Sequence, residues 1–473
     1  MNRLSTRWPS LATTALMAVL AIASVHDLVR LGDAVPWSKA IDLPDFYCAG
    51  RAVAHGESPY GVEPLRSCEH AINRGSLWRN PLYLVPAPQP PMDFLPYAAL
   101  SFLTYPAARI VAAVAIAAAV VVTALALANM GLPFWASLGA LALSDGFVEI
   151  SQGQIVPFAL LSLVFAALML ERGRHWIAGL LCVLTMIEPH VGGPACAGLF
   201  LYSPRSRVAM IVGIAGLVVV SVAAVGIQAC VEWAMQIIPG QALAEARLWN
   251  QYSLTAILAD AGVPVRVALA AGTVCFLVML CVGLWLGKRL SIRYYSPAFV
   301  VLAPAAFSIV GGTYVHVVEL PAAIPFLLLL VQHVAPRLRV TALISLVLIA
   351  IPWPFAQALK ALFFPSLLAT FLICWDFGVA AKTTAAILIA TAAALWGVAL
   401  HTPPALPLPR LHSGLYDSRG NVATAWTAIA GNEASMDVLR VIAKIPTWLG
   451  LLAMLTISLK EAPEPLEPAT NTG

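Results

Sequence analysis

The sequence predicts an all-α, polytopic membrane protein, and three observations lead to that fold class. The chain of 473 residues is 60% apolar and 11% charged. Its mean hydropathy of +0.85 is higher than a water-soluble core requires. Its apolar residues gather in runs near the length of about 20 that an α-helix needs to cross a bilayer. We therefore expect about 12–14 transmembrane helices.

Apolar runs divide the chain into expected spans separated by short polar loops. The first run lacks a convincing small-residue cleavage site, so we expect it to be retained as the first span. The expected spans are 9–29, 107–129, 132–149, 154–170, 207–229, 265–287, 296–310, 314–334, 339–358, 361–380, 383–400 and 441–459.

Basic residues predict the orientation, because Lys and Arg in short loops favour the cytoplasmic side. Arg3 and Arg7 place the N-terminus inside. The polar segments 31–95, 230–264 and 401–440 then share the outer face. We therefore expect a multi-pass membrane protein whose outer face is the place to look for chemistry. The net charge of +4 follows from this topology and gives no indication of nucleic acid.

The apolar segment 176–202 is interrupted by Glu188-Pro189-His190, which leaves two halves that are each too short to span a bilayer. This pattern predicts a broken, re-entrant hairpin. Such breaks occur where the backbone is buried in protein or lines a wet cavity, so Glu188 and His190 should face one. The alternative is a buried Glu–His pair that only supports the structure.

The remaining organisation is simple: a single transmembrane domain over 1–460 and a disordered acidic tail over 461–473. Cys48 and Cys68 both lie in the first outer loop. They could form a disulfide that closes a loop of roughly 20 residues and stabilises it by roughly 3 kcal/mol, although their separation in space cannot be read from the sequence. Cys/His spacing typical of a metal site is absent.

The stretch 42–60, DLPDFYCAGRAVAHGESPY, predicts a short helix on the membrane surface. Pro44 belongs at a helix start, Asp45 is a good N-cap, and Gly56 suits the residue after the C-cap. The Asp45 carboxylate could either cap this helix or act as a base toward a substrate hydroxyl. The local pattern does not separate these two roles.

These residues resemble glycosyltransferase family 87, a family of polytopic C-type glycosyltransferases. The resemblance rests on Asp-Phe-Tyr, Ala-Gly-Arg-Ala, Gly-Glu-Ser-Pro-Tyr and Gln-Pro-Pro followed by FLPYAALSFLTYPAA, then Gly153-Gln154, Ala178-Gly179 and WNQYSLTAIL. It covers about residues 42–335 in matching order. It implies transfer of a sugar, typically mannose, from a polyprenyl-phosphate donor to a glycan or glycolipid acceptor, at an active site on the outer face of the cytoplasmic (inner) membrane.

The resemblance also implies roles for individual residues. An acidic residue of the first outer loop would be the catalytic base, with Asp45 as the first candidate and Asp42 as the second. Arginine suits the departing phosphate because its guanidinium binds oxygen pairs. The cationic candidates are Arg51, Arg74, Arg79 and Arg247, and the other expected substrate-binding residues are Tyr60, Gln154, Glu188, His190, Asn250, Gln251, Tyr314 and His316.

One position departs from the family pattern, since relatives usually carry Lys-Pro where this chain has Glu188-Pro189. Two other function classes therefore remain open. A membrane transporter of a polar solute or lipid-linked sugar would also place polar residues on broken helices. The second open class is a degenerate, non-catalytic relative of the family. The motifs imply no cofactor and no metal ligand.

Overall fold

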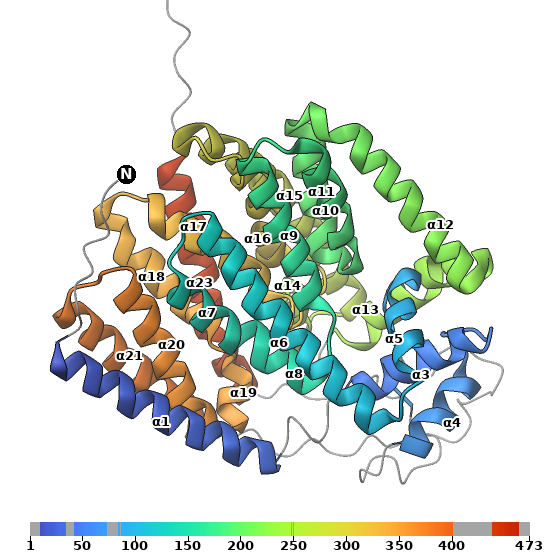
Figure 1. Ribbon diagram of the computed structural model, residues 1–473, viewed down its shortest axis with the longest axis horizontal. Coiled ribbons are helices and arrows are strands. Elements are labelled where there is room, and N and C mark those ends of the chain that lie inside the picture. Colours follow the sequence, from blue (N-terminus) through green and yellow to red (C-terminus); the bar gives the residue numbers. More distant parts are fainter. Residues whose placement is uncertain are drawn as a thin grey trace, which may run out of the picture.

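The computed structural model in Figure 1 is a helical bundle, which confirms the all-α class. It describes residues 10–34, 42–72, 84–85, 87–246, 248, 250–400 and 438–462. Within these ranges, 6 helices are long and apolar enough to cross a membrane, as a multi-pass membrane protein requires. Six of the twelve expected spans, 9–29, 107–129, 207–229, 265–287, 383–400 and 441–459, coincide with these helices, and the other expected spans fall on shorter helices.

The N-terminal half begins with α1 (Leu11–Ala34) and the short helices α3 (Leu43–Ala54), α4 (Val62–Ile72) and α5 (Phe94–Leu100). The helices that follow are α6 (Tyr105–Asn129), α7 (Phe134–Leu141), α8 (Phe147–Gln152), α9 (Val156–Glu171), α10 (His175–Leu184), α11 (Pro189–Tyr202) and α12 (Arg207–Glu232). A π-helical turn, Ala142–Gly146, joins α7 to α8.

The C-terminal half continues the bundle, and its helices carry the labels of Figure 1. They are α13 (Ile238–Ala244), α14 (Leu254–Asp260), α15 (Val265–Tyr294), α16 (Phe299–Gly311), α17 (Ala323–His333), α18 (Pro336–Ala350), α19 (Trp353–Ala358), α20 (Phe363–Asp376), α21 (Ala381–Ala399) and α23 (Val438–Glu461).

The expected span 314–334 differs from the structure, because α17 begins only at Ala323. Gly312 leaves the helical conformation at the end of α16. The backbone at His316 then forms an antiparallel β-bridge with Gln251 instead of a helical turn. Hydropathy alone misses this because the loop is rich in Val, which suits extended backbone as well as a span.

The segment 176–202 forms two helices that fold back on each other. The break lies at Glu188, whose backbone is extended with φ −122° and ψ 93°, and Pro189 begins α11. The ends of the pair meet: the His175 ring nitrogen Nδ1 lies 3.2 Å from the Ser203 hydroxyl. This is the shape of a hairpin, and its re-entry into a bilayer stays a prediction.

Segments rich in basic residues gather at one end of the bundle. Lys288 lies over the ring of Tyr202 at the end of α11. Arg293, near the end of α15, pairs with Glu461 at the end of α23 at 2.6 Å. The common location agrees with the sidedness predicted from the sequence, although the orientation in a membrane stays a prediction.

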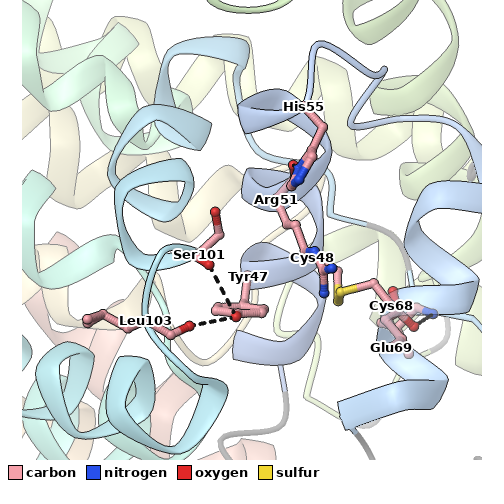
Figure 2. Close-up of a disulfide and its surroundings, with 9 residues drawn as sticks. Tyr47, Cys48, Arg51, His55, Cys68, Glu69, Ser101 and Leu103 are labelled. Atoms are coloured by element: carbon pink, nitrogen blue, oxygen red, sulfur yellow. Dashed lines mark hydrogen bonds between the residues drawn. A yellow bond between two sulfur atoms is a disulfide. The ribbon is translucent and has the colours of Figure 1, made fainter.

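The first outer segment builds a small core of its own from α3, α4 and α5, at the lower right of Figure 1. Figure 2 shows the Cys48–Cys68 disulfide that joins α3 to α4. The Tyr47 hydroxyl donates to the Leu103 carbonyl at 2.8 Å. Gly50 permits close packing, since a Cβ there would lie 2.3 Å from the backbone of Tyr97. These contacts fix the start of α3.

Candidate functional site

Asp42 lies where the start of α3 meets the turn between α8 and α9. Its backbone N–H donates to the Gln152 carbonyl at 2.9 Å. Its side chain accepts a hydrogen bond from Gln154 Nε2 at 2.5 Å. Two independent contacts therefore hold this carboxylate against the end of a helix that is distant in sequence.

Gly153 makes this contact possible. Its φ of 82° is in the left-handed region, and a Cβ at this position would lie 2.5 Å from the Cβ of Leu43. Leu43 is the residue next to Asp42. The Gly-Gln pair that the sequence analysis noted at the start of a span thus allows Gln154 to reach Asp42.

The loop between α16 and α17 supplies the opposite side of the site. His316 Nε2 lies 2.9 Å from a carboxylate oxygen of Glu245. The Tyr314 hydroxyl donates to the same carboxylate and accepts from Gln241 Nε2 at 2.8 Å. The charges of His316 and Glu245 both act on the Asp42 carboxylate. The loop and the start of α3 are therefore neighbours at one polar site.

The hairpin break contributes two further side chains to this site. Glu188, His190 and Glu319 each offer a ligand atom, and these three atoms lie within 4.8 Å of one another. The His190 ring stacks on Tyr314 with 5.8 Å between centroids. Glu319 also accepts the His316 backbone N–H at 2.6 Å. We call the set Asp42, Gln154, Glu188, His190, Glu245, Tyr314, His316 and Glu319 the site cluster.

Burial raises the pKa of Asp42 to about 6, while the Gln154 hydrogen bond and the nearby His316 act in the opposite direction. Asp42 is only partly buried. At neutral pH it is therefore an ionised, hydrogen-bonded carboxylate that a substrate can reach, as a general base must be.

Asp45 has a different environment. It is 0% exposed, and neither of its oxygens has a hydrogen-bond partner among the described residues. Burial, and next the neighbouring Glu69, raise its pKa well above the usual range. Burial likewise raises the pKa of Glu69 well above its usual value. We call Asp45 and Glu69 the loop carboxylate pair; burial disfavours the ionised form of both members.

The remaining predicted site residues lie outside the site cluster. Arg51 is exposed on the last turn of α3, where Figure 2 shows it beside His55. Tyr60 is 0% exposed and donates its hydroxyl hydrogen to the Gln89 carbonyl at 2.9 Å. It packs in the core of the loop and offers no free surface to a substrate.

Asn250 and Gln251 support the loop around His316. The Val317 N–H donates to the Asn250 carbonyl at 3.0 Å, and the Val315 N–H donates to the Gln251 side chain at 3.1 Å. These contacts position the loop. Of the predicted cations, Arg74, Arg79 and Arg247 lie outside the described residues.

Glu245 is the main member of the site cluster that sequence reasoning missed. It lies in a segment without helical periodicity or a motif, so no local signal marks it. The proximity of Glu188 and Glu319 was equally hidden, because they belong to the hairpin break and to a loop far along the chain. Spacing in the sequence cannot reveal a cluster built in this way.

The family model of glycosyltransferase family 87 matches residues 89–311. This range contains Gln154, Glu188, His190 and Glu245 of the site cluster. Tyr314, His316 and Glu319 follow just after its end, and Asp42 lies well before its start. The match confirms the resemblance found in the sequence over this part of the chain. Nothing matched among curated proteins or among solved structures.

Proposed function

We propose that this protein, with its match to glycosyltransferase family 87, transfers a sugar from a polyprenyl-phosphate donor to a glycan or glycolipid acceptor. The family resemblance suggests mannose as the sugar. The observation that carries the proposal is the position of Asp42: an ionisable carboxylate that is held by Gln154 and lies within electrostatic range of His316, in a polar site assembled from distant segments.

Asp42 suits the role of base better than Asp45. In the proposed reaction, an acceptor hydroxyl attacks the anomeric carbon and its proton passes to the base. The bond from that carbon to the phosphate oxygen breaks, and the phosphate leaves with the electron pair. A carboxyl that is already protonated cannot take this proton. The pKa of about 6 leaves Asp42 mostly ionised at neutral pH, whereas burial raises the pKa of Asp45 well above its usual range and so favours its protonated form.

The Cys48–Cys68 disulfide supports an active site on the outer face. Disulfides form and persist in oxidising compartments and are rare in the cytosol. This bond joins the two helices that follow Asp42 in the chain. The base would then lie on the side of the cytoplasmic membrane that faces away from the cytosol.

A transfer assay with purified protein tests the proposal. The full chain in nanodiscs should move radiolabelled mannose from polyprenyl-phosphate mannose into a membrane glycolipid extract. Asp42→Asn should abolish this transfer while the protein remains folded. Absence of transfer from every polyprenyl-phosphate hexose would overturn the proposal, and movement of labelled donor across proteoliposomes without transfer would favour a transporter.

A further inference from the structure

Glu188, His190 and Glu319 form a compact set of potential metal ligands. One atom from each side chain lies within 4.8 Å of the other two. Ligand atoms around a single transition-metal ion are roughly 3–4.5 Å apart, because each lies about 2.0–2.2 Å from the ion. Small side-chain rotations would therefore bring all three onto one cation.

Within the part of the chain that the structure describes, the two carboxyl groups of this set have no basic side chain paired with them. Among the described residues, no Lys or Arg forms an ion pair with Glu188 or Glu319. Glu149 is fully buried, its two oxygens have no hydrogen-bond partner in the described ranges, and its charge acts on both of these carboxylates. Buried carboxylates at such distances need a proton or a cation between them.

The ligands are held by neighbours outside the set. His190 stacks on Tyr314, and its backbone carbonyl accepts from the Ser308 hydroxyl at 3.3 Å. One oxygen of Glu319 is fixed by the His316 N–H. Metal ligands are commonly oriented by such contacts from surrounding residues. Glu188 and His190 are also only half-buried, which leaves the ion a route of entry.

We infer that Glu188, His190 and Glu319 bind one divalent transition-metal ion, Mn²⁺ or Zn²⁺. One imidazole nitrogen with two carboxylates suits these ions better than Mg²⁺ or Ca²⁺, which prefer oxygen alone. Three protein ligands leave a position open for a substrate oxygen. Resting on the proposed function, the inference gives the ion a role: it would hold the departing phosphate of the donor.

Electron paramagnetic resonance with Mn²⁺ tests the site directly. The full-length protein in nanodiscs, stripped with a chelator, should bind one Mn²⁺ per chain. Glu319→Gln and His190→Ala should weaken this binding at least tenfold. Glu171→Gln and His175→Ala are matched controls at the opposite end of the bundle and should bind as the unaltered protein does. Equal binding by all of these proteins, or none by any, overturns the inference.

A spectroscopic signature covers the case in which a variant folds poorly. Electron spin echo modulation of the bound Mn²⁺ should show coupling to an imidazole nitrogen in the unaltered protein. That coupling should disappear in His190→Ala and persist in His316→Ala. The reverse pattern would assign the nitrogen to His316 and contradict the proposed ligand set.

The same samples separate this inference from the proposed function. Sugar transfer by metal-stripped protein that binds no Mn²⁺ would overturn the metal site and leave the transferase intact. Bound Mn²⁺ without any sugar transfer would support the metal site and overturn the proposed transferase function. Glu188→Lys adds a sharp comparison: it should lose Mn²⁺ but supply a fixed cation, so any transfer that remains should no longer respond to added metal.

Discussion

Asp42 and Asp45 lie one helical turn apart at the start of α3, yet their surroundings differ in solvent access and in hydrogen-bond partners. The site cluster around Asp42 is partly open and combines a carboxylate with amide and imidazole groups. The loop carboxylate pair around Asp45 is closed and contains two acids and no cation among the described residues. Burial alone therefore does not identify the catalytic base. The solvent access of the carboxyl group and its hydrogen-bond partners do.

Replacing each aspartate by asparagine should give the largest difference between the two regions. Asp42→Asn should lower the rate of sugar transfer by at least about 100-fold, the usual contribution of a general base. Asp45→Asn should stay within a few-fold of the unaltered protein, because the amide resembles the protonated acid already present. Initial rates with saturating donor measure both. A normal rate for Asp42→Asn would return attention to Asp45.

The pH dependence should report Asp42 alone. Its pKa of about 6 predicts that transfer falls roughly tenfold for each pH unit below that value, as the base becomes protonated. Asp45→Asn should keep the same profile, because burial already favours the protonated form of the carboxyl group that the amide replaces. A profile of kcat/KM from pH 4.5 to 8 measures this dependence. A different apparent pKa in Asp45→Asn would contradict the assignment to Asp42.

Gly153→Ala should displace Asp42 from its position beside Gln154 but leave its carboxyl group chemically unchanged. The added methyl group would meet Leu43 and displace the start of α3, so transfer should fall by about tenfold, as small misplacements of a catalytic group do. Gly173→Ala is the matched control, because Gly173 also has a positive φ of 68° but nothing lies within 4 Å of its Cβ position. Equal losses in the two variants would mean that backbone strain alone is responsible.

The smallest expected effect is on stability: Asp42→Asn, which should slow transfer, should make the folded protein more stable. The folded state raises the pKa of Asp42 from 3.8 to about 6, so its contribution to stability is complete below pH 3.8 and is lost as pH rises through 6. Ionised Asp42 therefore costs up to about 3 kcal/mol at neutral pH. Asp42→Asn should raise the melting temperature by a few degrees at pH 7.5, and much less at pH 4.

Six of the twelve expected spans were predictable from the sequence, because lipid requires long apolar helices and hydropathy records that requirement directly. The break at Glu188 was predictable for a related reason: Pro189 and two charges cannot continue a lipid-facing helix. The choice between Asp42 and Asp45 was not. It depends on Gly153 and Gln154, which helical spacing within 42–60 cannot place.

The disulfide between α3 and α4 also bears on how the chain is made. Cys48 and Cys68 are the first two of its eight cysteines, and the next is Cys182 in the hairpin. A thiol oxidase that meets the growing chain in order of synthesis finds one pair and no alternative partner. Biogenesis should therefore require an oxidant but no isomerase, since reshuffling corrects pairings that this order of cysteines does not permit.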